Sequence, residues 1–154
     1  MMTKEEVHLQ KIADIMTKDV RYCIAEDNVF EAASKMAMLN VGFIPIVSNG
    51  QLIGVLTDRD IVIRGVAEKR PNSTPVTEIM TTDVITATPD MTTEEAAELM
   101  AKHQIRRLPV VEGTKLVGVV ALGDLAVEKM SDEQAGQALS QISETHERTS
   151  PSAH

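Results

Sequence analysis

The sequence predicts an α/β protein built from two pseudo-symmetric units, each with the order strand, helix, strand, strand, helix. Two observations predict this fold. The chain repeats itself at an offset of 64 residues: of the 48 pairs that residues 15–62 form with residues 79–126, 16 are identical. In each copy, an apolar stripe of helical spacing precedes two short apolar runs separated by turn residues. The 154 residues are therefore expected to form two similar units rather than one ordinary domain.

Each copy opens with a short lead-in and a strand. Helical lead-ins are predicted over 12–16 and 76–80, and in both copies they run into the motif Ile-Met-Thr. Strands are predicted around 20–24 and 84–88.

A helix follows in each copy. An apolar stripe marks its buried face, and the glutamates after Thr92 suit the first turn of a helix, so Thr92 or Thr93 is expected to start the second one. The stripe comprises Val29, Ala32, Ala33 and Met36 in the first copy and Ala96, Ala97 and Met100 in the second.

Two strands and a last helix complete each copy. Asn49-Gly50 lies between two apolar runs and is a strong signal for a tight hairpin turn. The predicted strands cover 43–47, 51–56, 107–111 and 115–120, and the predicted closing helices cover 58–67 and 122–130.

The repeat also gives the expected domain boundaries. The first unit spans 10–68, and the second spans 76–130. Residues 69–77, rich in proline and small polar residues, are expected to be the linker. Residues 131–154 are predicted to form a short helix and then a disordered tail.

Composition excludes several functions. A formal charge of −8 and three aromatic residues argue against a general nucleic-acid binder, which needs basic and stacking surfaces. Cys23 is the only cysteine, so it is expected to pack as a small hydrophobe on its strand. No apolar run approaches twenty residues and no signal-peptide pattern opens the sequence, so a soluble cytoplasmic protein is expected.

The end of the first hairpin carries the best candidate site. Thr57 and Asp60 lie where a strand ends and a helix begins, so a hydroxyl and free amides suit an anionic oxygen. Asp60 can accept two hydrogen bonds from a vicinal diol. Ile24 and the pair Ile44-Pro45 are candidate walls for a base. Alternatively, Thr57 is a helix N-cap and Asp60 is an acid in the first turn, and spacing alone favours this simpler interpretation.

The second copy offers an unequal counterpart. Asp124 matches Asp60, but Ala121 stands where the first copy has Thr57. Arg106 and Arg107 precede the strand that contains Leu108-Pro109, and arginine forks suit phosphate oxygens. Alternatively, these arginines form a solvated strand edge or pair with acids such as Asp58.

These motifs resemble a tandem CBS-domain pair, or Bateman module, of the small stand-alone bacterial kind. The resemblance rests on the doubled Ile-Met-Thr lead-ins, the two aliphatic-proline strands and the Gly-x-x-Thr-x-x-Asp run at 54–60. It implies two units packed through their sheets, with clefts between them that bind adenosine nucleotides or S-adenosylmethionine. The implied contacts are ribose for Asp60 and Asp124, phosphate or ribose for Thr57, phosphate for Arg106 or Arg107, and the base for Ile24, Thr88, Ile44, Pro45, Leu108 and Pro109.

The resemblance implies a regulatory, nucleotide-sensing module. AMP, ADP, ATP or S-adenosylmethionine would bias the arrangement of the units or of a homodimer that buries helix faces, and an unknown protein would receive the signal. No enzyme is expected, because the sequence has neither a nucleophile paired with a base nor a glycine-rich phosphate loop. No required cofactor, metal site or membrane partner is expected. The alternative is a ligand-independent dimeric scaffold with vestigial clefts, and a role on nucleic acid is disfavoured by charge.

Overall fold

The protein is described by a computed structural model that covers residues 10–128. These residues form two compact units. Unit 1 contains residues 10–18, 86–112 and 117–128, and unit 2 contains residues 19–85 and 113–116. The fold is mixed α/β, as predicted. The predicted C-terminal helix and tail (131–154) lie outside the described residues.

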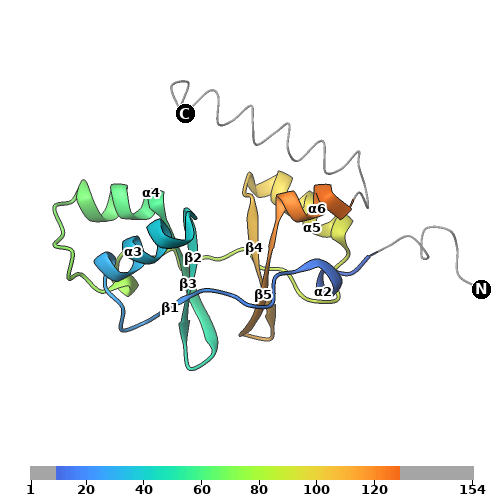
Figure 1. The fold of residues 1–154 in the computed structure, drawn as a ribbon, viewed down its shortest axis with the longest axis horizontal. Coiled ribbons are helices and arrows are strands. Elements are labelled where there is room, and N and C mark those ends of the chain that lie inside the picture. The colour runs from blue at the N-terminus through green and yellow to red at the C-terminus, as the bar shows by residue number, and fades with distance from the viewer. Residues whose placement is uncertain (1–9, 129–154) are drawn as a thin grey trace, which may run out of the picture. The chain divides into compact units, whose positions relative to one another are not determined.

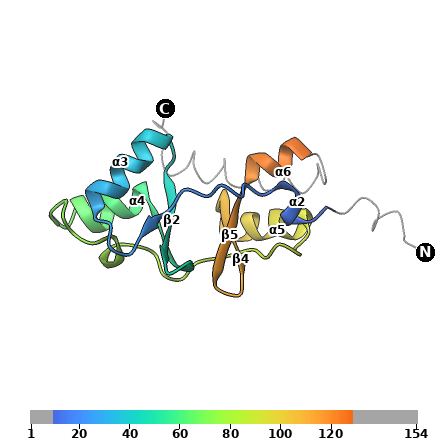
Figure 2. The same cartoon turned by 60° about the horizontal axis from the view of Figure 1, so that its bottom comes forward.

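Unit 2 has its helices on one side of a strand hairpin. Helices α3 and α4 lie on the same side of β2 and β3 in Figures 1 and 2. The elements are β1 (Cys23–Ile24), α3 (Val29–Leu39), β2 (Phe43–Ser48), β3 (Gln51–Thr57), α4 (Asp58–Asp60), the π-helical η1 (Ile61–Val66) and the 3-10 helix η2 (Val76–Glu78).

The β2–β3 hairpin follows the predicted turn. Strand β2 runs antiparallel to β3 from Phe43↔Thr57 to Ser48↔Gln51, and β1 runs parallel to β2. Asn49 and Gly50 connect the strands with φ angles of 53° and 79°. Two successive left-handed residues match the right-handed twist of the strands, which is why Asn-Gly is favoured there.

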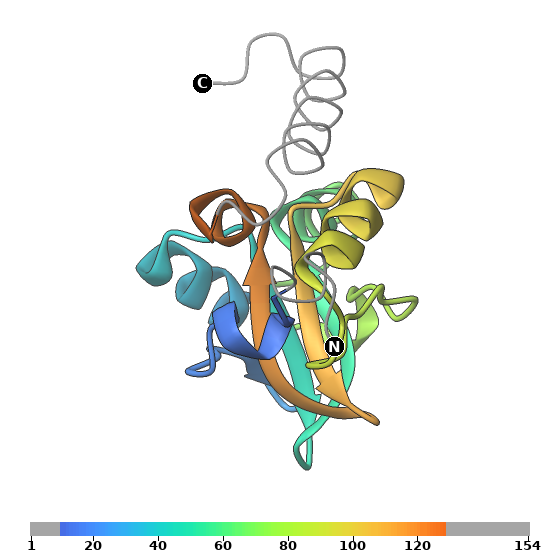
Figure 3. The ribbon, with the colours of Figure 1, turned by 90° about the vertical axis from the view of Figure 1, so that its right-hand side faces the viewer.

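Unit 1 repeats this arrangement. Helices α2, α5 and α6 lie on the same side of the β4–β5 hairpin, toward the viewer in Figure 3. The elements are α2 (Ile12–Ile15), α5 (Thr93–His103), β4 (Arg107–Glu112), β5 (Lys115–Ala121) and α6 (Leu122–Glu128). The first two residues of β5 group with unit 2.

Capping boxes start the two long helices. Asn28 caps α3 together with Glu31, and Thr92 caps α5 together with Glu95. The choice left open by the sequence between Thr92 and Thr93 therefore falls on Thr92. Its backbone N–H and hydroxyl both donate to Glu95 Oε1, at 2.9 and 3.1 Å, and they hold the pKa of Glu95 below its ordinary value.

The first strand of the second copy is missing. The prediction of a strand over 84–88 is wrong, because only Ala87 pairs, with Val110. In the first copy, the Ala25 backbone N–H continues the pairing by donating to Val47 O at 3.2 Å. Pro89 occupies the matching position in the second copy and has no N–H to donate. The first-copy strand is itself shorter than predicted, covering two residues.

The helix after the first hairpin also differs from its prediction. It begins at Asp58, as expected, but only one turn is α-helical before the backbone widens into η1. The Ala67 backbone N–H accordingly donates to Val62 O, five residues back. The matching helix α6 is described to Glu128.

The lead-ins are exchanged between the two repeats. In unit 1, Thr17 of the first repeat pairs with Val119 of the second, with N···O distances of 2.9 and 3.0 Å. In unit 2, Thr81 of the second repeat pairs with Val55 of the first, at 2.8 and 2.9 Å. Each compact unit therefore combines a hairpin from one repeat with the lead-in of the other, so the units group residues differently from the sequence boundaries 10–68 and 76–130.

Two glycines make room for the exchanged lead-ins. A Cβ at Gly54 would lie 2.6 Å from the Met80 sulfur and 2.9 Å from the Thr81 carbonyl oxygen. A Cβ at Gly118 would lie 2.6 Å from the Met16 sulfur and 3.0 Å from the Thr17 carbonyl oxygen. The backbone oxygens cannot move freely without weakening the pairing, so a side chain at either position would strain it.

The core of unit 2 is aliphatic, as the shortage of aromatic residues predicts. Ile79, from the exchanged lead-in, is fully buried with residues of the first repeat. The buried cluster comprises Cys23, Val29, Ala32, Met36, Ile44, Ile46, Leu56, Val76 and Ile79.

Substituting the close-contact glycines should destabilise the protein. We expect Gly54→Ala and Gly118→Ala each to lower the free energy of unfolding by about 1–3 kcal/mol through overpacking against backbone. Urea denaturation measures this. Gly123→Ala is the matched control, because a Cβ there meets nothing within 4 Å, and it should be neutral or slightly stabilising in a helix. Equal stability of all three variants would contradict the close packing.

Candidate functional site

The junction of β3 and α4 brings Thr57 and Asp60 together in a capping box. The Asp60 backbone N–H donates to Thr57 Oγ1 at 3.1 Å, and the Thr57 backbone N–H donates to Asp60 Oδ2 at 3.0 Å. The helix-cap role that spacing alone favoured is therefore present. It leaves the hydroxyl hydrogen of Thr57 available to a ligand oxygen, because the hydroxyl acts here as an acceptor.

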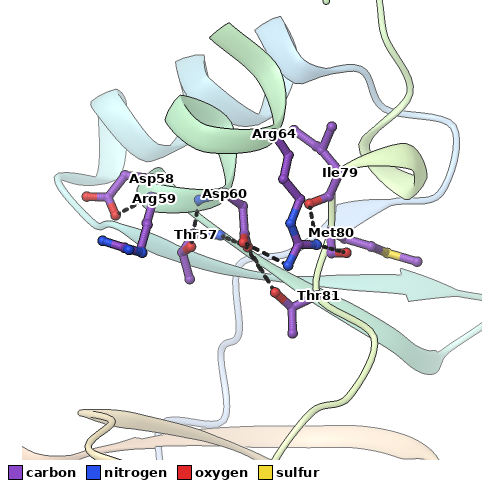
Figure 4. A network of polar contacts seen from close by, with 8 residues as sticks. All are labelled: Thr57, Asp58, Arg59, Asp60, Arg64, Ile79, Met80 and Thr81. Carbon is purple, nitrogen blue, oxygen red and sulfur yellow. Dashed lines mark hydrogen bonds and ion pairs between the residues drawn. The ribbon is translucent and has the colours of Figure 1, made fainter. Parts of the chain in front are cut away.

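Asp60 is the centre of a larger polar network (Figure 4). The Thr81 hydroxyl shares its single hydrogen between Asp60 Oδ1 and Oδ2, at 3.3 and 3.2 Å. Arg64, one turn further along the chain, places its guanidinium Nη2 3.9 Å from Asp60 Oδ1. The Asp60 side chain is 11% exposed, so its charge is held by these partners more than by water.

Arg64 links the network to the exchanged lead-in. Its Nη1 donates to the carbonyl oxygens of Ile79 and Met80 at 3.4 and 3.1 Å (Figure 4). These carbonyls lie just beyond η2, where a helix end leaves oxygens unpaired. One side chain therefore neutralises the carboxylate and also fixes the segment that carries Thr81.

Sequence reasoning missed Arg64 and Thr81. The i,i+4 spacing of Arg64 from Asp60 was a usable signal for an ion pair on a helix. Thr81 belongs to the repeated Ile-Met-Thr motif, but 21 residues separate it from Asp60, and only the tertiary pairing with β3 brings them together.

The expected apolar walls of the first site differ in exposure. Ile44 and Pro45 are both buried in β2, with Ile44 belonging to the core. Ile24 has an exposed side chain, and its backbone N–H donates to Asp27 Oδ2 at 2.9 Å. Of the three, Ile24 presents its side chain at the surface.

The second copy has a simpler arrangement. Asp124 is half-buried, and its Oδ2 accepts one hydrogen bond, from the Ala121 backbone N–H at 2.9 Å. Among the described residues, no hydrogen bond joins it to Thr17, the counterpart of Thr81. The two aspartates therefore occupy equivalent positions with unequal partners.

The remaining second-copy candidates lie at different depths in unit 1. Arg106 and Thr88 are exposed, and Arg107 is half-buried at the start of β4. Leu108 and Pro109 are buried, like their counterparts in β2.

A separate groove lies between α3 and the α4–η1 helix. Its volume is about 480 Å³. It is lined by Ala33, Met36, Ala37, Asn40, Val41, Gly42, Asp58, Ile61 and Val62. The lining is mainly aliphatic, and it does not include Thr57 or Asp60.

Cys23 is fully buried in β1, as predicted. Burial raises the pKa of its thiol from 9.0 to about 11, with Asp27 adding to the rise and Lys35 opposing it. Within residues 10–128, no group of three or more histidine, cysteine or acidic side chains is placed to hold a metal ion. Over the same residues, no helix is long and apolar enough to cross a membrane.

A family model describes both repeats. The CBS domain model matches residues 12–65 and matches again at residues 76–130. The chain belongs to the CBS-domain family. It carries two CBS domains in tandem, and such a CBS pair is a regulatory module.

Known proteins similar to this CBS pair include two from Bacillus subtilis (strain 168). The CBS domain-containing protein YhcV is 50% identical over 135 residues, covering 88% of this chain and 96% of that protein. The uncharacterized protein YlbB is 49% identical over 142 residues, covering 91% and 96%. The solved CBS domain pair of protein MJ0100, in complex with methylthioadenosine and S-adenosyl-L-methionine, has a TM-score of 0.67 and 31% identity, covering 77% of this chain and 94% of that one.

The unequal partners of the two aspartates predict unequal effects on stability. We expect Asp60→Ala to lower the free energy of unfolding by about 1–3 kcal/mol, because it removes a cap acceptor, the Thr81 bonds and the Arg64 partner. Asp124→Ala removes one hydrogen bond and should cost less, about 0.5–1 kcal/mol. Urea denaturation of both variants tests the order, and a larger loss for Asp124→Ala would contradict the described network.

The buried thiol predicts a stability loss at high pH. The folded protein keeps the Cys23 proton up to about pH 11, whereas the unfolded chain releases it near pH 9.0. The contribution of the protonated Cys23 thiol to the free energy of unfolding is therefore fully present below pH 9, and it declines by about 2–3 kcal/mol as pH rises to 11. The stability difference between wild type and Cys23→Ala, measured from pH 8 to 11, should shrink over that range. A constant difference would contradict the raised pKa.

Proposed function

We propose that this CBS pair senses adenine nucleotides, which bind at Thr57 and Asp60 and bias its conformation or dimer arrangement. The observation that carries the proposal is the Asp60 carboxylate, which is almost buried yet held in place by the Thr57 N–H and a nearby arginine. A preorganised acceptor-only group of this kind suits a ribose diol. The MJ0100 CBS pair, in complex with two adenosine derivatives, supports the same ligand class.

The other groups at this site have matching roles in the proposal. The Thr57 hydroxyl, whose hydrogen is free, donates to a phosphate or ribose oxygen. Ile24 flanks the base at the surface, and the buried residues Ile44 and Pro45 of β2 form the inner side of the base site. The ligand is AMP, ADP, ATP or S-adenosylmethionine. No cofactor is required, because the ligand is bound and released unchanged.

We propose a second, weaker site in the second CBS domain. Asp124 takes the ribose there, and Arg106 or Arg107 contacts the phosphate, but Ala121 provides no hydroxyl. The base contacts are Thr88, Leu108 and Pro109. The boundaries 10–68 and 76–130, joined by 69–77, remain our proposed division of the two CBS domains.

A homodimer in the cytoplasm completes the proposal, with a separate protein as the receiver of the signal. Large apolar side chains are exposed on α3 and η1, and one of them, Val62, lines the groove between these helices. They are Phe30, Met38, Val62, Ile63 and Val66, which are 44–76% exposed. Burying such side chains against a second copy is favourable, since exposed apolar patches mark interaction surfaces.

The same apolar surface favours a second candidate function. In this alternative, the protein is a ligand-independent dimeric scaffold and its nucleotide sites are vestigial. A melting temperature that no adenine nucleotide raises would favour the scaffold.

Calorimetric titration tests the sensor. We expect at least one of AMP, ADP, ATP and S-adenosylmethionine to bind the wild type, and Asp60→Asn to weaken that binding about tenfold or more, since it removes a charged acceptor while preserving shape. Asp124→Asn is the matched control and should weaken it less.

Each contrary result has a distinct meaning. Binding that Asp60→Asn leaves unchanged would show that the site assignment is wrong. Absence of binding by all four ligands would reject the sensor in favour of the scaffold. Conversion of the nucleotide during long incubation would show that the protein is an enzyme.

A further inference from the structure

The two carboxylate oxygens of Asp60 are unequally occupied. Oδ2 accepts from the Thr57 backbone N–H at 3.0 Å and from the Thr81 hydroxyl at 3.2 Å. Among the described residues, the neighbours of Oδ1 are the Thr81 hydroxyl, at 3.3 Å, and the Arg64 guanidinium, at 3.9 Å. A carboxylate oxygen has about two lone-pair directions. Oδ2 therefore has a full backbone hydrogen bond and the shorter branch of the shared Thr81 bond, whereas Oδ1 has the longer branch and a guanidinium beyond hydrogen-bond distance, which leaves room for another donor.

A ribose diol needs both oxygens. Its two neighbouring hydroxyls bind a carboxylate best when each donates to a different oxygen. The first ribose hydroxyl is accommodated at Oδ1. The second ribose hydroxyl requires an acceptor position on Oδ2. The Thr57 N–H cannot give up its position, because it is fixed by the helix cap. Only the Thr81 hydroxyl can turn away.

We propose that Thr81 is an internal competitor for the ribose subsite and sets its affinity for ligands that carry a vicinal diol. The inference rests on the proposed function, since it concerns the same aspartate. The displacement is local. The Thr81 backbone remains paired with Val55 through two hydrogen bonds, of 2.8 and 2.9 Å, so only the side chain has to rotate. The ligand therefore replaces one charge-assisted hydrogen bond and leaves the lead-in in place.

The other repeat provides an internal control. Thr17 has the same place in its motif and the same two-bond backbone pairing, with Val119. Within the described residues, no hydrogen bond joins its hydroxyl to Asp124. A substitution at Thr17 thus makes the same side-chain change in the same backbone pairing, but it removes no competitor for the aspartate.

Titration of Thr81→Val with AMP and with 2′,3′-dideoxy-AMP tests the inference. Valine keeps the shape of threonine and removes the hydroxyl. We expect AMP to bind Thr81→Val about three- to tenfold more tightly than wild type, which corresponds to the net worth of one hydrogen bond. The dideoxy analogue should bind both proteins equally, because it has no diol to compete with Thr81. Thr17→Val should change neither affinity. Thr81→Ser, which keeps a hydroxyl, should have the wild-type affinity for AMP.

A second measurement separates competition from a structural role. Loss of the hydroxyl should lower the urea midpoint of Thr81→Val while raising its affinity for AMP, whereas a merely structural role would lower both. AMP binding to Thr81→Val that is equal to or weaker than wild type overturns the competitor and leaves the nucleotide sensor standing. If neither protein binds AMP, ADP, ATP or S-adenosylmethionine, the sensor fails and the competitor fails with it.

Discussion

The rest of the structure depends on the exchange of lead-ins, made by two equivalent pairs of backbone hydrogen bonds. Thr17 pairs with Val119 in unit 1, and Thr81 pairs with Val55 in unit 2. The exchange requires glycine beneath each lead-in methionine, because a Cβ there meets backbone oxygen within about 3 Å. Each compact unit is therefore built from segments of both repeats.

The exchange also determines the chemistry around Asp60. Sequence-local interactions complete the helix cap with Thr57, and a lone cap would be the ordinary first turn of a helix. The lead-in adds the Thr81 hydroxyl and two carbonyl oxygens that hold Arg64 in place. An isolated carboxylate so close to full burial would be costly without these partners. The candidate site thus uses residues from both repeats within one compact unit.

Much of the fold could be predicted because its signals are local. The Asn49-Gly50 turn, the Thr92 capping box and the apolar stripes depend on residues a few positions apart. The failures have local causes of a subtler kind. The strand at 84–88 is lost because Pro89 has no N–H to donate to the neighbouring strand, and the helix after Thr57 widens into a π-helix that its apolar pattern does not distinguish from an α-helix.

The sequence by itself determined the duplication, the aliphatic character of the core and the pairing of Thr57 with Asp60, because repeats, composition and i,i+3 contacts are written along the chain. Only the tertiary structure decided which lead-in packs on which hairpin. It also decided that Thr81 contacts Asp60, whereas within residues 10–128 no matching hydrogen bond from Thr17 reaches Asp124. The physical reason is that the two lead-ins carry the same Ile-Met-Thr motif and are locally equivalent. Long-range backbone pairing alone distinguishes their places.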